Sequence, residues 1–90
     1  MTEATHIIVH GRVQGVWFRA GTKERADELG VFGWVRNRPE GTVEIQAEAE
    51  KAILENFIEW CRKGTPAANV TSLDIEPASL QNFTSFEIRS

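Results

Sequence analysis

The sequence predicts one α+β domain in which two helices cover one face of an antiparallel sheet. Three observations favour this class. Apolar residues recur at helical spacing in two segments, 18–29 and 50–63. Apolar and polar residues alternate in segment 42–48, and β-branched or aromatic residues fill the other short segments between turns. Ninety residues suffice for a single domain over residues 1–90 with one modest core.

The chain begins with a predicted strand over residues 6–10, in which Ile7 and Val9 share one face. A helix follows the glycine-containing segment 11–19. Its buried face is predicted from four residues at helical spacing: Phe18, Thr22, Ala26 and Leu29. Gly30 is expected to end this helix, because glycine readily adopts the left-handed conformation that closes helices.

The second and third predicted strands form a hairpin. Residues 31–38 are rich in β-branched and aromatic side chains, and Pro39-Glu40-Gly41 makes a tight turn into the third strand, 42–48. Two sets of side chains alternate in the third strand: Val43, Ile45 and Ala47 against Thr42, Glu44, Gln46 and Glu48. The alternation predicts a half-buried strand with one face in water.

The second half of the chain adds one helix and two strands. The helix, 50–63, carries a broad apolar stripe formed by Ile53, Leu54, Phe57, Ile58, Trp60 and Cys61. A strand follows over 70–76, and in a last short strand, 83–89, we expect Phe86 and Ile88 to point inward. The order β-α-β-β-α-β with a short extra C-terminal strand is that of the ferredoxin-like sandwich.

Composition and charge exclude several classes of function. The net charge is −3, so a general affinity for nucleic acid is not expected. No segment approaches the roughly 18 consecutive apolar residues of a membrane span, and the N-terminus lacks the pattern of a secretory signal. Cys61 is the only cysteine, and its place on the apolar stripe predicts a buried, unreactive thiol. A chain without an intrachain disulfide fits a reducing compartment, so we expect a cytoplasmic protein, and the sequence favours a monomer.

The segment 11–19, Gly11-Arg12-Val13-Gln14-Gly15-Val16-Trp17-Phe18-Arg19, is the part of the chain best suited to chemistry. A glycine-containing loop between a strand and a helix turns backbone N–H groups toward one point, and the positive end of the helix dipole adds to them. Arg19 closes the loop, and its planar guanidinium can bind two oxygens of one phosphate. The segment therefore predicts an anion-binding site.

The predicted topology brings Asn37 to this site. The first and second strands of a β-α-β unit run parallel, so their C-terminal ends meet at one edge of the sheet. Segment 11–19 follows the first strand and Asn37 ends the second. Its carboxamide can donate a hydrogen bond to an oxygen and accept one from a water, although a simple turn asparagine is an alternative. Arg36 and Arg38, beside it, either steer anions toward the site or are solvated charges.

These segments resemble the two signatures of the acylphosphatase family. Segment 11–19 is similar to the first, whose core is G-x-V-Q-G-V-x-F-R. Gly33-Trp34-Val35-Arg36-Asn37 followed by Gly41-Thr42-Val43-Glu44 is similar to the second. The resemblance extends to Phe86-Glu87-Ile88-Arg89 and covers essentially the whole chain. It departs from the family pattern at Ala49, where a glycine is usual, and we expect that residue past the third strand and outside the site.

The resemblance implies hydrolysis of the carboxyl-phosphate bond of acyl phosphates, without a metal or other cofactor. It also implies a phosphate-binding loop formed by Gln14, Gly15, Val16, Trp17, Phe18 and Arg19. Arg19 would bind the phosphoryl group with the loop amides, and Asn37 would orient the attacking water. Inorganic phosphate is then both product and expected inhibitor. This division of roles fits the chemistry, because phosphoryl transfer needs mainly positioning and charge stabilisation, and a carboxylate leaves without a general acid.

A metal-dependent phosphatase is the first alternative. Glu44, Glu48 and Glu50 are candidate ligands, but a polar strand face and a favourable first helical turn explain them better. His6 and His10 lie about 13 Å apart along one strand at ~3.3 Å per residue, too far to share a metal. We expect both histidines to be solvated or hydrogen-bonded.

Two further alternatives are a phosphate-binding module and an RNA-recognition module. A binding module that holds a phosphate without turnover would use the same loop, but it has less use for Asn37. An RNA-recognition module has the same order of elements, but it stacks bases on aromatic residues of its third strand, and 42–48 contains none.

The aromatic residues of the two signatures have structural interpretations as well. Trp17 and Phe18 are candidates to cover the acyl group of a substrate, although Phe18 is expected rather to pack the first helix onto the sheet. Trp34 lies in a predicted strand and is expected in the core.

Overall fold

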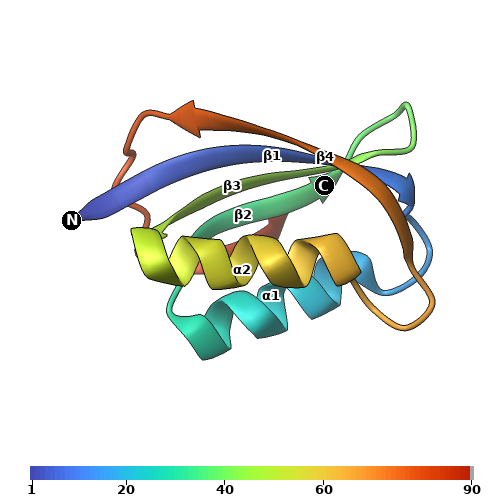
Figure 1. Cartoon of the computed structure of the whole chain (residues 1–90), viewed down its shortest axis with the longest axis horizontal. Coiled ribbons are helices and arrows are strands. Elements are labelled where there is room, and N and C mark those ends of the chain that lie inside the picture. Colours follow the sequence, from blue (N-terminus) through green and yellow to red (C-terminus); the bar gives the residue numbers. More distant parts are fainter. Residues whose placement is uncertain (90) are drawn as a thin grey trace.

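The structure is a computed structural model and describes residues 1–89. Within these residues, two helices cover one face of a five-stranded sheet (Figure 1). The strands are β1 (Thr2–Arg12), β2 (Phe32–Asn37), β3 (Val43–Glu50), β4 (Asn69–Ala78) and β5 (Phe86–Arg89), and the helices are α1 (Phe18–Leu29) and α2 (Lys51–Lys63). The ferredoxin-like α+β fold is therefore confirmed.

The strand order in the sheet is β4-β1-β3-β2-β5. The first four strands pair antiparallel, as predicted, whereas β5 pairs parallel with β2 and makes the sheet mixed at that edge. β1 and β2 both run opposite to β3, which lies between them. Their C-terminal ends at Arg12 and Asn37 therefore lie at the same edge of the sheet, where the site is predicted.

Several strand bounds differ from the predicted ones. β1 is longer than 6–10, because β3 and β4 bond to its two sides along most of its length. β3 continues to Glu50, so Ala49 lies inside the strand opposite Glu3 and not past it. Ala49 is not among the positive-φ residues of the described chain, so its backbone does not require glycine. β5 begins only at Phe86.

The core lies between the helices and the sheet. Phe57 and Phe86 meet edge to face with ring centres 6.0 Å apart, and the ring centres of Phe18 and Trp60 lie 5.6 Å apart. Phe18 therefore packs α1 onto the core, as expected. Cys61 is fully buried, and burial raises the pKa of its thiol well above the usual range, which agrees with an unreactive cysteine. In residues 1–89 no helix has the length and apolarity needed to cross a bilayer.

The prediction of a solvent-exposed face on β3 is wrong. The side chains on the face away from the helices belong to Glu44, Gln46 and Glu48, which are 8%, 5% and 3% exposed. The cause is the position of β3 in the middle of the sheet, where side chains of β1 and β2 flank each of these residues. Alternation identified the two faces of the strand, but it contained no information on what covers the second one.

Trp34 lies on the same outer face, so its expected place in the core is also wrong. It is half-buried, and the guanidinium carbons of Arg36 and Arg89 lie 5.3 and 5.1 Å from its ring centre. Along β2, Gly33 and Val35 are buried, whereas Trp34 shares the opposite face with Arg36. The indole therefore forms cation–π contacts on the surface of the sheet.

Glu48 fixes the connection between β4 and β5 to this outer face. Its carboxylate accepts hydrogen bonds from the backbone N–H groups of Gln81, at 2.5 Å, and Phe83, at 3.1 Å. Asn82, between them, has a φ of 60°. A left-handed residue flanked by two N–H donors is typical of a backbone anion-binding concavity, so this one holds an internal carboxylate.

We expect Glu48→Gln to lower the free energy of unfolding by about 1 to 3 kcal/mol, because two charge-assisted hydrogen bonds to a buried group are weakened. Urea titrations of the variant and the parent protein measure this difference. Glu3→Gln, an exposed carboxylate on β1, is the matched control and should leave stability nearly unchanged. Equal stability of the two variants would contradict the anchoring role of Glu48.

Candidate active site

The connection from β1 to α1 leaves a series of backbone donors without partners. Gly15 and Trp17 have φ values of 74° and 64°. None of the backbone N–H groups from Gln14 to Arg19 donates a hydrogen bond to another group in residues 1–89. The last two of these residues form the start of α1, whose first turn has N–H groups without helical partners. The segment can therefore donate several hydrogen bonds to an anion.

Arg19 lies in the first turn of α1, next to the buried Phe18. Its side chain is exposed, and it forms no ion pair with a carboxylate of residues 1–89. A guanidinium without a carboxylate partner keeps its donors available for an incoming oxyanion.

Asn37 ends β2 on the face that the helices cover. It is two residues beyond the buried Val35, and side chains two apart in a strand share a face. Its side-chain oxygen Oδ1 is buried and has no hydrogen-bond partner among the described residues. Buried acceptors are nearly always paired in folded proteins, so this oxygen is available for a ligand or a water.

Arg19 and Asn37 line one hollow of about 440 Å³, which we call the phosphate pocket. The residues around it are Val13, Gly15, Trp17, Phe18, Arg19, Ala20, Asn37 and Ile88. Of the residues predicted for the site, Gln14 and Val16 are not in its lining. Val13, Ala20 and Ile88 are in the lining, although they lie outside the predicted phosphate-binding loop of residues 14–19.

Ile88 shows why one wall was missed. Its register partner on β2 is Val35, so it lies on the helix-covered face, as expected from the alternation in the last strand. It is nevertheless 44% exposed, and it lines the pocket together with Phe18, the first residue of α1. The alternation predicted the face correctly and the burial incorrectly.

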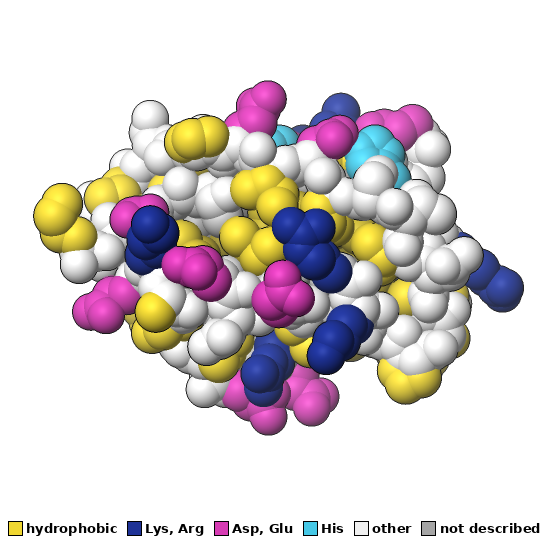
Figure 2. All heavy atoms as spheres, in the orientation of Figure 1, with side chains coloured by type: hydrophobic (Ala, Val, Ile, Leu, Met, Phe, Trp, Pro, Cys, Tyr) yellow, Lys and Arg dark blue, Asp and Glu magenta, His cyan; other side chains and the backbone are white. Residues whose placement is uncertain are grey.

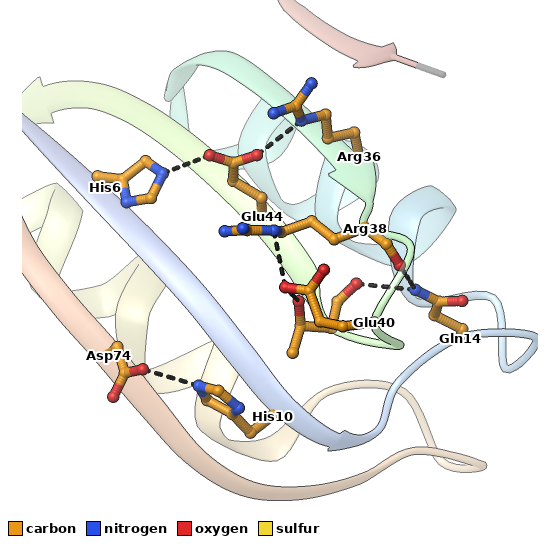
Figure 3. A network of polar contacts seen from close by, with 9 residues as sticks. His6, His10, Gln14, Arg36, Arg38, Glu40, Glu44 and Asp74 are labelled. Carbon is orange, nitrogen blue, oxygen red and sulfur yellow. Dashed lines mark hydrogen bonds and ion pairs between the residues drawn. The ribbon is translucent and has the colours of Figure 1, made fainter.

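Gln14 connects the loop to the β2–β3 turn. Its side-chain Nε2 donates hydrogen bonds to the backbone oxygens of Arg38 and Thr42, both at 2.8 Å (Figure 3). Arg38 follows Asn37 directly, so one side-chain amide ties the loop to the segment that holds the asparagine. The side chain of Gln14 therefore has a positioning role, whereas only its backbone N–H is free to bind an anion.

The other arginines near Asn37 have carboxylate partners (Figure 3). Arg36 Nε lies 2.6 Å from Glu44 Oε1, and Arg38 Nε lies 2.9 Å from Glu40 Oε2. On the face seen in Figure 2, acidic and basic side chains are interspersed and do not form a basic surface. Within the described chain, Arg19 is the one cationic residue that lines the pocket.

The histidines are hydrogen-bonded, as expected. Nε2 of His6 lies 2.6 Å from Glu44 Oε2, and Nε2 of His10 lies 2.7 Å from Asp74 Oδ2 (Figure 3). Residues 1–89 contain no cluster of three His, Cys, Asp or Glu side chains placed to hold a metal ion. The carboxylate of Glu44, one of the candidate ligands, is instead bonded to His6 and Arg36.

Glu44 makes the stability of the fold depend on pH. Its burial by itself raises the pKa, but hydrogen bonds from His6 and Arg36 and the charge of Arg36 outweigh that effect, so the pKa of Glu44 is lower than its usual value of 4.5. A lowered pKa in the folded state means that the ionised carboxylate contributes stability above the usual pKa and loses it as the pH falls.

We therefore expect Glu44→Gln to flatten the loss of stability below about pH 4.5 and to lower stability at neutral pH. Urea titrations of variant and parent at a series of pH values measure both effects. Glu55→Gln, on the exposed surface of α2, is the control and should follow the parent protein. If the acid limb of Glu44→Gln matches that of the parent, Glu44 does not carry this pH dependence.

Comparisons with known proteins find relatives over nearly the whole chain. A family model described as acylphosphatase matches residues 5–88. The chain is 49% identical over 84 residues to a protein named acylphosphatase from Methylococcus capsulatus, covering 92% of this chain and 91% of that protein. It is 47% identical over 87 residues to a protein of the same name from Cupriavidus pinatubonensis, covering 97% and 96%.

The fold is similar to that of solved structures with the same name. The crystal structure of acylphosphatase from Bacillus subtilis superimposes with a TM-score of 0.95 at 40% identity, and the match covers 100% of both chains. The structure of an acylphosphatase from Coxiella burnetii gives a TM-score of 0.94 at 34% identity, covering 98% of this chain and 93% of that one. Both matches include the elements that carry Arg19 and Asn37.

Proposed function

This chain belongs to the acylphosphatase family, and from that premise we propose how its residues hydrolyse acyl phosphates. The reaction cleaves the carboxyl-phosphate bond, an acid anhydride, and gives a carboxylate and inorganic phosphate. The observation that carries the proposal is the pairing, in one pocket, of Arg19 and the buried Oδ1 of Asn37, neither of which has a carboxylate or hydrogen-bond partner among residues 1–89.

Arg19 binds the phosphoryl group together with the backbone N–H groups of Gln14, Gly15, Val16, Trp17 and Phe18 and its own. Two features support this role: those N–H groups have no partners in residues 1–89, and the start of α1 adds the positive end of its dipole. Charge that spreads over the phosphoryl oxygens in the transition state is then met by donors that are already in place.

Asn37 orients the attacking water. Its Oδ1, which has no partner in the described residues, accepts a hydrogen bond from that water, and its amide N–H donates one to a phosphoryl oxygen. The water oxygen forms a bond to phosphorus while the bond from phosphorus to the carboxyl oxygen breaks. The water's proton passes to a phosphoryl oxygen, and the carboxylate leaves as an anion that needs no proton donor.

The proposal is tested by incubating the protein with acetyl phosphate in the presence of a chelator and measuring the release of inorganic phosphate. We expect turnover well above the buffer rate, unchanged by the chelator. Inorganic phosphate should inhibit competitively, since it is the product and fits the same donors. A rate equal to that of buffer would leave only a phosphate-binding module.

We propose further that residues 1–90 act as a single domain, as a monomer in the cytoplasm, and without a metal or other cofactor. The carboxylate is a good leaving group that departs without a Lewis acid, which supports a reaction without a metal. The elution volume in size-exclusion chromatography tests the monomer.

A further inference from the structure

A second hollow lies beside the phosphate pocket and shares Trp17 and Ala20 with it. Its volume is about 480 Å³, and we call it the side groove. Val16, Gly21, Pro66 and Ala67 form most of the rest of its wall, so the groove lies between the start of α1 and the turn that joins α2 to β4.

The wall of the side groove is almost entirely apolar. Thr65 belongs to it, but its hydroxyl donates a hydrogen bond to the backbone oxygen of Val16 at 2.7 Å, so it is not free for a ligand. The methyl group of Thr65 lies so close to Gly21 that a Cβ there would be 2.8 Å from it. Glu24, at the exposed surface of α1, is the one charged residue of the lining. A groove with this lining favours an apolar group and disfavours a second anion.

Trp17 combines two features that are unusual for a bulky apolar residue. Its side chain is 81% exposed, and its φ of 64° is rare for a bulky residue. Strained conformations that persist are concentrated at functional sites. The indole lines both hollows, so it provides an apolar surface directly beside the phosphate pocket.

We propose that the side groove binds the acyl group of the substrate while the phosphate pocket holds its phosphoryl group. This inference rests on the proposed function. In an acyl phosphate a single oxygen separates the acyl carbon from phosphorus, so the acyl group must lie against a wall of the phosphate pocket. Trp17 forms such a wall and continues into the groove, and the small Ala20 leaves the passage open. The preferred substrates are therefore acyl phosphates with an aromatic or branched apolar acyl group.

The test compares benzoyl phosphate with acetyl phosphate, which share the phosphoryl group and differ in apolar area. In Trp17→Asn, where asparagine tolerates the left-handed backbone, we expect KM for benzoyl phosphate to rise about three- to tenfold through loss of the ring contact. KM for acetyl phosphate should change much less. Ala67→Leu fills the groove at a residue that does not line the phosphate pocket. It should also raise the ratio of KM for benzoyl phosphate to KM for acetyl phosphate.

Phe32→Ala is the matched control, because Phe32 is an exposed aromatic residue on β2 that lines neither hollow. Its ratio of KM values should equal that of the parent. Ile88→Ala removes the other apolar wall of the phosphate pocket. The proposal is overturned if neither Trp17→Asn nor Ala67→Leu raises the ratio, or if Ile88→Ala alone does.

A binding experiment separates this proposal from the proposed function. Benzylphosphonate and methylphosphonate cannot be hydrolysed at an acyl bond, and their affinities are measured by calorimetry. We expect benzylphosphonate to bind more tightly, and Trp17→Asn to reduce that difference. If acyl phosphates are not hydrolysed but benzylphosphonate still binds more tightly, the proposed function is wrong, whereas binding of an apolar group in the side groove is supported. If acyl phosphates are hydrolysed but both phosphonates bind equally well, the side groove does not bind the acyl group.

Discussion

Arg19→Ala should lower kcat/KM for acetyl phosphate by about 10³- to 10⁴-fold, because it removes the one cationic side chain of the described phosphate pocket. Competitive inhibition by inorganic phosphate should disappear in the same variant. Initial rates with and without added phosphate measure both effects. Stability should stay within about 0.5 kcal/mol of the parent, since the side chain is exposed and forms no ion pair in residues 1–89.

Two variants show whether this loss is specific. Arg12→Ala removes an exposed arginine from the end of β1, outside the pocket lining, and should keep activity close to that of the parent. Arg19→Lys keeps the charge but loses the planar two-donor geometry, so it should recover only a minor part of the activity. Equal activities of Arg19→Ala and Arg12→Ala would exclude Arg19 from the site.

Asn37→Ala should lower kcat by about 10²- to 10³-fold, because the water is no longer held in the direction of attack. The inhibition constant of phosphate should change little, since Arg19 and the loop amides are intact. This separation of turnover from phosphate affinity distinguishes Asn37 from Arg19. It is measured by steady-state kinetics with phosphate as the inhibitor.

Asn56→Ala, an exposed asparagine on α2, is the control for the chemical change and should have no effect. Asn37→Asp places a carboxylate beside the bound phosphate, so it should weaken phosphate inhibition as well as turnover. A near-normal kcat in Asn37→Ala would show that another group orients the water.

The fold was largely predictable because the periods of its elements are clear. Phe18, Thr22 and Ala26 mark one face of α1, and all three are buried. The parallel course of β1 and β2 placed Asn37 at the edge where the loop begins, and the structure brings Asn37 and Arg19 to one pocket. Both results depend on local patterns and on topology, which a single sequence contains.

The incorrect predictions for β3 and Ile88 concern what covers a face. Nothing within β3 indicates that its outer carboxylates are covered, since the covering residues come from β1, β2 and the connection to β5. The face of Trp34 was predictable, because it alternates with the buried Val35. The two hydrogen bonds of the Gln14 side chain were not, because their acceptors are backbone oxygens more than 20 positions away.

The position of β1 between β3 and β4 has a consequence for how the chain folds. The N-terminal strand must pair with residues more than 30 positions away on one side and about twice as far on the other, as between His6 and its partners Gln46 and Glu76. Such distant pairings require large loops to close first, so this topology folds more slowly than a helical bundle of equal length. β3 lies between β1, which the phosphate-binding loop follows, and β2, which Asn37 ends. Catalytic competence should therefore arise late in folding, together with the central strands.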